Sequence, residues 1–367
     1  MKAAQRSVLF SLLAALLCAA AATAAGEPTT PRWSADKAWQ WYYQQPWLCG
    51  FNYVPANAIS YTEMWMDYSF DAALIDKELA LAEQVGFNCL RVVLPFVVWE
   101  HDPAAFKKRF ETFLAISDRH GLKIMPCFFD DCVFGLIVDP AYGRQPDVVE
   151  GWYANGWTPS PGHGRVKDPA VRPALERYVK DIMTAHKNDP RILCWDIYNE
   201  ASNSDMGEAS LPLVRDAFGW AREIDPIQPI TSGVYSGYQP LNTILSEQSD
   251  ITTFHSYEPA DQLKQIIDRL RAIGRPMINT EWLNRPRGST VQGCLPVFFA
   301  EDVGCLNWGL VNGRTQTHLP WGSRPGAPVS ALWQHDLYRG DHTPYAPTEL
   351  ELFQRLIQLS RKGKSAR

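Results

Sequence analysis

The chain has 367 residues, of which 46% are apolar and 20% charged, and its net charge is −5 at pH 7. A net negative charge argues against a nucleic-acid-binding protein, which would carry a basic surface. We expect the short basic tail at 361–367 to be solvated. The length is sufficient for one large α/β domain with an extensive core.

The first 25 residues have the pattern of an export signal. Lys2 and Arg6 give a positively charged start, residues 8–23 form a short apolar core, and small residues lead up to Gly26. This arrangement is typical of a leader that is cleaved during secretion. The sequence therefore predicts a signal peptide at 1–25 and a secreted or periplasmic mature protein.

Two membrane-bound alternatives have weaker support. The apolar core is short for a bilayer span and consists largely of small residues. Lipid attachment through Cys18 is the second alternative, but Leu17 before it is bulkier than lipoprotein signals normally allow. No later segment reaches about 18 continuous apolar residues, so we expect residues 26–367 to form one domain that does not associate with membranes.

After residue 47, short apolar runs alternate with longer segments whose apolar residues recur at helical spacing. The expected strands are 48–54, 87–94, 122–129, 192–198, 229–234, 251–255, 276–281 and 303–310. The helices expected after them are, in the same order, 72–86, 104–120, 170–186, 211–224, 241–248, 261–273, 290–299 and 348–360. Eight strand–helix units predict parallel strands joined by crossovers. Because eight units suit a closed barrel better than an open sheet, the expected fold class is α/β, a single (β/α)8 TIM barrel.

Residues 130–168, after the third expected strand, interrupt this alternation. The segment is rich in Gly, Pro and aromatic residues, and it is too long for an ordinary connection between a strand and a helix. Long irregular segments inside compact domains are usually functional loops. The sequence therefore predicts a loop insertion after the third strand that contributes to function.

Motifs for bound cofactors are missing from the sequence. No GxGxxG or Walker-type loop follows an expected strand, and no CxxC pair or His cluster has the spacing of zinc ligands. We therefore expect no cofactor and no metal. Three of the seven cysteines after the leader lie in apolar, strand-like runs and are expected to be buried thiols: Cys89, Cys127 and Cys194. Two disulfides remain open, Cys127 with Cys132 and Cys294 with Cys305, because spacing does not determine connectivity.

Two of the expected strands end in a glutamate. In a (β/α)8 barrel the active site lies at the C-terminal ends of the strands, where Glu200 follows the fourth strand and Glu281 closes the seventh. One such glutamate would be interpreted as a buried carboxylate held by an arginine or by backbone donors. Two at one barrel mouth suit glycoside cleavage, in which one carboxyl protonates the leaving oxygen and the other, about 5–5.5 Å away, attacks the anomeric carbon.

In this setting the sequence resembles clan A of the glycoside hydrolases, and it looks most like the family 5 group of cellulases and mannanases. The resemblance rests on Leu90-Arg91-Val92 with Pro95 and Trp99, on Asn199-Glu200, on His255-Ser256-Tyr257, on Thr280-Glu281-Trp282 and on Asn307-Trp308. These motifs follow the order of the clan and span residues 48–310. The sequence departs from the family at Ala201, where proline is usual, and at 128–131, where a histidine is often found.

The resemblance implies a retaining β-glycoside hydrolase that cleaves β-linked oligo- or polysaccharides through a covalent glycosyl-enzyme. It implies that Glu200 is the general acid/base and Glu281 the nucleophile. Asn199 would bond the 2-hydroxyl of the sugar, a contact that tightens at the transition state. Arg91 would lie beneath Glu281 and hold it ionised, and Tyr257 would donate a hydrogen bond to the same carboxylate.

Four further residues complete the expected binding site. By resemblance, His255 would line the subsite of the cleaved sugar, and Trp308 would be the platform on which that sugar stacks. Asp131 is expected to bind sugar hydroxyls, although capping a loop or helix is an equal alternative for it and for Asp130. Trp282 is expected at the cleft wall, with packing in the core as the alternative.

Other functions and the mode of action remain open in the sequence. A transglycosylase would use the same two glutamates, and a carbohydrate-binding barrel that has lost activity would keep the fold. The elbow pattern Gly-x-Ser-x-Gly of serine hydrolases is missing. The insertion at 130–168 could close one end of the cleft and make the enzyme exo-acting, or widen an endo-acting groove. Aromatic residues in expected loops are candidates for stacking on sugars: Trp152, Trp157, Trp321 and Trp333.

Overall fold

The computed structural model describes residues 30–326, 328 and 330–365; the expected leader at 1–25 lies outside them. Eight strands form one sheet in which all the pairings are parallel. They are β1 (Cys49–Asn52), β2 (Cys89–Val93), β3 (Lys123–Asp130), β4 (Trp195–Asn199), β5 (Ile230–Thr231), β6 (Thr252–His255), β7 (Met277–Trp282) and β8 (Gly304–Trp308). Each lies within or overlaps a strand expected from the apolar runs.

The sheet closes into a barrel. Its strand order is β5-β4-β3-β2-β1-β8-β7-β6, so β1 pairs with β8 and only the junction between β5 and β6 lacks a regular ladder. At this junction Val234 forms an isolated parallel bridge with Phe254, and the Val234 amide donates to the Thr253 carbonyl at 2.9 Å. The predicted (β/α)8 barrel is confirmed.

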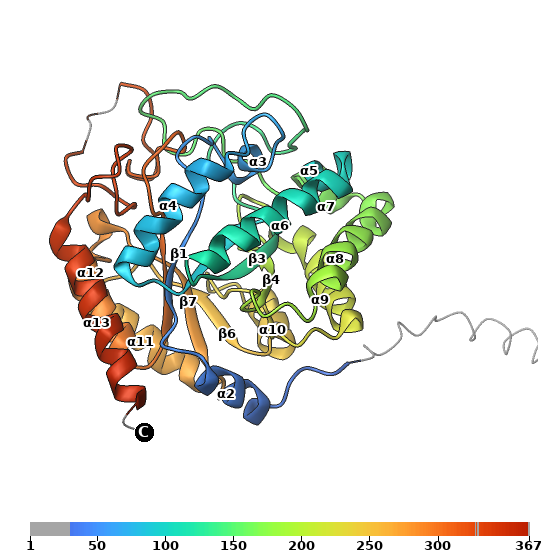
Figure 1. The fold of residues 1–367 in the computed structure, drawn as a ribbon. Coiled ribbons are helices and arrows are strands. Elements are labelled where there is room, and N and C mark those ends of the chain that lie inside the picture. Colours follow the sequence, from blue (N-terminus) through green and yellow to red (C-terminus); the bar gives the residue numbers. More distant parts are fainter. Residues whose placement is uncertain (1–29, 327, 329, 366–367) are drawn as a thin grey trace, which may run out of the picture.

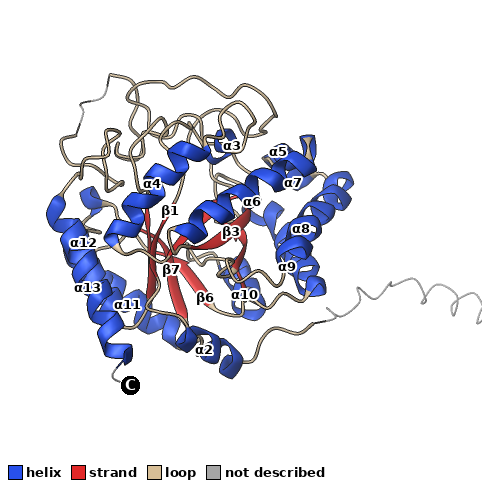
Figure 2. Ribbon diagram, in the orientation of Figure 1, coloured by secondary structure: helices blue, strands red, loops and turns tan. Residues whose placement is uncertain are grey.

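An outer ring of helices covers the barrel (Figures 1 and 2). These are α4 (Ala72–Val85), α6 (Pro103–Arg119), α8 (Arg172–His186), α9 (Leu211–Ile224), α10 (Gln239–Gln248), α11 (Ala260–Arg271), α12 (Val291–Ala300) and α13 (Pro347–Ser365). All eight correspond to expected helices. Their ends follow local chemistry: the Asp71 side chain caps α4 by accepting from two backbone amides, and Gly86 ends it with φ of +93°.

Several short elements were not expected from the sequence. They are the α-helices α2 (Ala35–Gln44), α3 (Tyr61–Met64), α5 (Phe96–His101) and α7 (His163–Lys167), and the 3₁₀ helices η1 (Pro169–Val171), η2 (Gly207–Ser210) and η3 (Arg285–Arg287). Helix α2 covers the N-terminal end of the barrel, where Trp33, Ala38 and Tyr42 pack with Leu48 and Met125 in a separate core cluster. Figure 1 shows α2 at the lower end of the molecule.

The long loops gather at the opposite end, which is the C-terminal end of the strands (Figure 2). They include the expected insertion after β3 and the connection from β8 to α13. The seven described cysteines are all free and buried, so neither of the two disulfides left open above is formed. Among the described residues, no helix is both long and apolar enough to cross a membrane.

Candidate active site

Glu200 and Glu281 face each other in a cavity of about 470 Å³ at the C-terminal end of the barrel. Glu281 lies in β7 and Glu200 directly follows β4. One carboxylate oxygen of each lies within 4.8 Å of the other, and His255 Nδ1 is within the same distance of both. Glu200 has φ of +42°, a left-handed conformation that is costly for a residue with a Cβ and is typical of functional positions.

Arg91 in β2 joins Glu281 to the floor of the barrel. The guanidinium is 3% exposed; its Nη1 donates to Glu281 Oε1 at 2.8 Å and its Nη2 to Asn199 Oδ1 at 2.7 Å. Its Nε bonds Asp196 at 2.8 Å. Burial lowers the pKa of Arg91, but the charge of Asp196 and smaller contributions that include Glu281 outweigh burial and keep the pKa above its usual value. Arg91 is therefore a permanent cation beneath Glu281.

The second oxygen of Glu281 also has a donor. Tyr257, which follows β6, donates from its hydroxyl to Glu281 Oε2 at 2.8 Å. Burial and then the charge of Glu281 raise the pKa of Tyr257 well above its usual value, so the hydroxyl keeps its proton. Both carboxylate oxygens of Glu281 thus accept a hydrogen bond, one from a cation and one from a hydroxyl, which fixes the plane of the carboxylate.

Glu200 has different partners. His255 Nδ1 lies 2.7 Å from its Oε1, while Asn203 Nδ2 donates to Oε2 at 2.5 Å and Cys132 Sγ lies 3.2 Å from the same oxygen. Burial raises the pKa of Glu200, but the hydrogen bond and the charge of His255 reverse this and leave the pKa below its usual value. Burial lowers the pKa of His255, and the charges of Glu281 and Glu200 raise it above its usual value. Both directions favour a proton on His255 over one on Glu200.

Asn199 is positioned by a carboxylate that the sequence did not assign to this role. Asp130, fully buried at the end of β3, accepts from Asn199 Nδ2 at 2.8 Å and from Trp157 Nε1 at 2.9 Å. Burial, partly offset by the Asn199 hydrogen bond, raises the pKa of Asp130 to about 7. Asp130 and Arg91 thus hold opposite ends of the Asn199 amide, which fixes its orientation beside the cavity.

Asp131 does not reach the cavity. It is fully buried, and both its oxygens are occupied: Tyr198 donates to one at 2.7 Å, and Ser202 N and Ser210 Oγ donate to the other at 2.7 and 2.5 Å. Asp131 thereby anchors the turn that follows Glu200. The expectation that it contacts sugar hydroxyls is corrected, because adjacent residues at the end of β3 point to opposite faces of the strand.

Trp282 is also displaced from its expected place. Its side chain is 0% exposed and packs on Phe298 and Phe353, with ring centroids 5.3 and 6.0 Å away. Because Glu281 points into the barrel, the next residue of β7 points outward against the helices. The structure corrects the expected position at the cleft wall to one in the core.

The remaining expected residues line the cavity: Asn199, His255, Tyr257 and Trp308. Of the loop tryptophans, Trp157 and Trp321 line it, whereas Trp152 and Trp333 are not among its lining residues. Sequence reasoning missed several lining residues: Cys132, Phe134, Asn203, Tyr235, Glu258 and Arg287. They lie in loops after β3 to β7, and only their place at strand ends could have indicated them.

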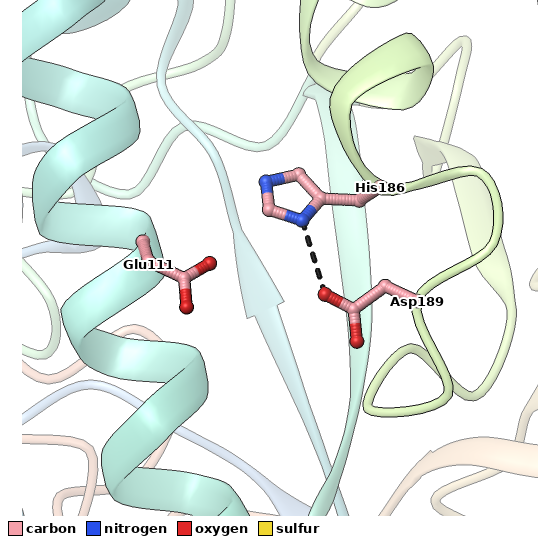
Figure 3. A group of neighbouring side chains, drawn as sticks. All are labelled: Glu111, His186 and Asp189. Atoms are coloured by element: carbon pink, nitrogen blue, oxygen red, sulfur yellow. Dashed lines mark hydrogen bonds and ion pairs between the residues drawn. The ribbon is translucent and has the colours of Figure 1, made fainter.

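A second acidic cluster lies outside the cavity. Glu111, His186 and Asp189 come together between α6 and the end of α8, and Figure 3 shows the His186–Asp189 contact. Arg191 neutralises this cluster by bonding both Glu111 oxygens at 2.7 and 2.9 Å and Asp189 at 2.6 Å. Burial raises the pKa of Asp189, and the Arg191 hydrogen bonds then lower it to about 2. The guanidinium occupies the position where a cation would bind, so this cluster is a salt-bridge network.

Comparison with known proteins supports the fold. No protein family matches the sequence, and no curated protein sequence is similar to it. Among solved structures, the chain is similar to the exo-beta-1,4-mannosidase Op5Man5 from Opitutaceae bacterium strain TAV5, with 19% identity, a TM-score of 0.60, and coverage of 86% of this chain and 60% of that one. The present chain thus spans less than two thirds of that enzyme.

Two further structures are similar. GH5_18 from Streptomyces cattleya, in complex with Manβ1-4GlcNAc, has 14% identity and a TM-score of 0.59, and the match covers 86% of this chain and 81% of that one. The endo-1,4-beta-D-mannanase from Thermotoga petrophila RKU-1 has 15% identity and a TM-score of 0.55, with 85% and 99% covered. The expected likeness to family 5 and related glycoside hydrolases is confirmed at the level of the fold.

Proposed function

We propose that the protein is a retaining β-glycoside hydrolase, with Glu281 as nucleophile and Glu200 as general acid/base. The observation that carries this proposal is the pair of glutamates whose oxygens approach within 4.8 Å in one cavity. That range suits the separation of about 5–5.5 Å between carboxyls in retaining enzymes and is shorter than the separation of about 6.5–9.5 Å in inverting ones. Their different partners support different roles.

The contacts support a two-step reaction. Glu281, held by Arg91 and Tyr257, attacks the anomeric carbon while the proton of the Glu200–His255 pair passes through Glu200 to the leaving oxygen. The glycosyl-enzyme then reacts with water, from which Glu200 removes a proton. Formation of the ester removes the negative charge of Glu281, which is one of the charges that raise the pKa of His255. Asn199, fixed by Arg91 and Asp130, faces the cavity where the sugar 2-hydroxyl would lie.

The test is the stereochemistry of the product. β-Linked aryl glycosides and oligosaccharides of mannose, glucose, xylose and galactose form the panel, with β-mannosides first because neighbouring folds belong to enzymes named for them. We expect that at least one is hydrolysed and that NMR detects the β-anomer as the first product. An α-anomer would exclude the two-step reaction. Binding without turnover across the panel would favour a carbohydrate-binding barrel.

The Glu200–His255 pair predicts a specific pH dependence. The active form carries one proton on the pair, and that proton is lost as pH rises through the raised pKa of His255. We expect the basic limb of kcat/KM to lie above about 6.5, the ordinary value for histidine. In His255→Gln only a carboxyl, whose ordinary pKa is about 4.3, can hold the proton, so the limb should move to lower pH.

The measurement is a pH profile of kcat/KM on an aryl β-glycoside. His186→Gln is the matched control, because His186 is buried to a similar extent but lies outside the cavity beside Asp189. Its profile should match that of the wild type. A basic limb that stays in place in His255→Gln would show that His255 does not hold the proton.

A further inference from the structure

The proposed chemistry determines which side of the cavity each part of the substrate occupies. Glu200 protonates the oxygen that leaves with the aglycone, so the aglycone lies on the side of Glu200, towards Asn203 and Tyr235. Any sugars attached to the non-reducing side of the cleaved residue must extend away from Glu200. The strand order β4-β3-β2-β1-β8 places Glu200 and Trp308 on opposite sides of the barrel. If the cavity is closed beyond Trp308, only the terminal sugar of an oligosaccharide can be removed; if it is open, the oligosaccharide can be cleaved internally.

Trp157 forms a wall on that side. Its Nε1 donates to Asp130 at the end of β3, and its ring meets Trp308 at the end of β8 edge-on, with centroids 5.4 Å apart and an angle of 89°. Strands β2 and β1 lie between β3 and β8, so the indole crosses their ends. Tyr61, which follows β1, packs against Trp157 at 4.9 Å. Trp157 is 3% exposed and is held on three sides.

Little space remains around this wall. One cavity of about 10 Å³ lies between the two tryptophans, the ends of β1 and β2 and the catalytic Glu281. Another of about 10 Å³ lies beyond the same two tryptophans, at the start of the β8 loop. A volume of this size holds about one water molecule. A sugar ring does not fit there, whereas the cavity with the glutamates measures about 470 Å³.

Three loops are tied together around the wall. Gln316 in the β8 loop donates to the carbonyls of Val149 and Trp152 in the insertion at 2.9 and 3.1 Å, and it accepts from Gly151 N at 3.0 Å. Arg314 donates to the Asn57 carbonyl and to Glu63 in the segment after β1 at 2.8 and 2.9 Å. The loops approach so closely that a Cβ at Gly313 would lie 2.3 Å from Ala56 Cα. These contacts between the loops hold Trp157 and Trp308 in place and close this side of the cavity.

From this closure we infer that the enzyme is exo-acting and removes single sugars from the non-reducing end of β-linked oligosaccharides. The terminal sugar ends against Trp157 and Trp308, and the rest of the chain leaves on the side of Asn203 and Tyr235. The inference rests on the proposed function and answers the choice between exo and endo action that the sequence left open. The similar mannosidase and mannanase structures do not decide it, since one enzyme is named exo and the other endo.

The experiment uses β-1,4-linked mannotetraose, cellotetraose, xylotetraose and galactotetraose with a fluorophore at the reducing end. An exo-acting enzyme releases unlabelled monosaccharide and labelled trisaccharide first. The same compounds carrying a methyl group on the terminal 4-oxygen should be cleaved about 10- to 200-fold less efficiently, because a closed pocket has no space for the added group. An equal rate with the cap, or labelled disaccharide as the first product, would overturn exo action and leave the hydrolase intact. Failure of every uncapped compound and aryl glycoside would refute the proposed function itself.

A variant tests the role of the wall. Gln316→Ala removes the bonds between the insertion and the β8 loop, and we expect the preference for uncapped over capped substrate to fall. Gln354→Ala on α13 is the matched control, because its side-chain hydrogen bond to the Gln84 carbonyl lies at the exposed surface. That control should keep the wild-type preference. An unchanged preference in a folded Gln316→Ala protein would show that the tied loops do not set it.

Discussion

Glu281→Gln is expected to reduce kcat by about 10⁴-fold or more, on the scale seen when a single essential catalytic group is removed from a hydrolase. The loss corresponds to about 5.4 kcal/mol or more of transition-state stabilisation. The amide has nearly the shape of the carboxylate but cannot form the glycosyl ester. Arg91 and Tyr257 would keep a partner at this position, so substrate binding should change far less than turnover. Initial rates and equilibrium binding of the same oligosaccharide measure the two effects.

A second variant tests whether the loss of kcat results only from destabilisation of the fold. Asp250→Asn alters a buried ion pair of the same kind, because Asp250 is 0% exposed and bonds Arg222 at 2.8 Å. This pair precedes β6 at the N-terminal end of the barrel, where residues serve stability. Disrupting a buried pair costs on the order of 3–5 kcal/mol, so both variants should melt at lower temperature. Only Glu281→Gln should lose turnover while it remains folded. Comparable turnover in the two folded variants would show that Glu281 is not the nucleophile.

Substitution by alanine adds a chemical signature. In Glu281→Ala an added azide ion can occupy the vacated space and attack the anomeric carbon directly, with Glu200 still available as acid. A single displacement inverts the configuration, so the expected product is the α-glycosyl azide, which NMR identifies. A β-glycosyl azide from this variant would mean that another residue still acts as nucleophile.

The apolar pattern predicted the barrel because each strand of a parallel sheet is buried on both faces and reads as a continuous run. Strand ends were predicted less accurately: the run at 229–234 contains only the two-residue β5. After it, Ser232 forms hydrogen bonds with the Ser249 hydroxyl and, through its own hydroxyl, with the Tyr198 carbonyl, and an apolar pattern does not indicate such contacts. The short helices α3, α5 and α7 were not predicted, because each is too short for apolar residues to recur at helical spacing. Their positions depend on contacts with residues far away in the sequence.

The candidate site was predictable where its residues lie at strand ends and carry a charge or a motif, as with Arg91, Glu200 and Glu281. Prediction failed where orientation mattered. Trp282 follows Glu281 in the same strand, and the alternation of side chains sends it to the other face. The sequence offered Asp130 and Asp131 as equivalent candidates. In the structure the first holds Asn199 and the second anchors the turn after Glu200, a difference that only tertiary contacts create.

Glu200→Ala should separate substrates by the quality of their leaving group. An unactivated oligosaccharide needs the proton from Glu200, and loss of a general acid costs about 10²- to 10⁴-fold. A 2,4-dinitrophenyl β-glycoside leaves without protonation, so its first step should remain nearly as fast as in the wild type. Deglycosylation then becomes slow because no base activates the water, and a burst of dinitrophenol should precede the steady state.

Azide distinguishes this residue from Glu281. In Glu200→Ala the nucleophile still inverts the anomeric carbon once, and azide, which needs no base, inverts it again. The expected product is therefore the β-glycosyl azide, with a faster steady state than in water alone. Glu208→Ala, a nearby exposed glutamate beyond the cavity, should behave as the wild type with every substrate. Equal losses on activated and unactivated glycosides in Glu200→Ala would contradict an acid/base role, because only the unactivated leaving group depends on the proton that this carboxyl delivers.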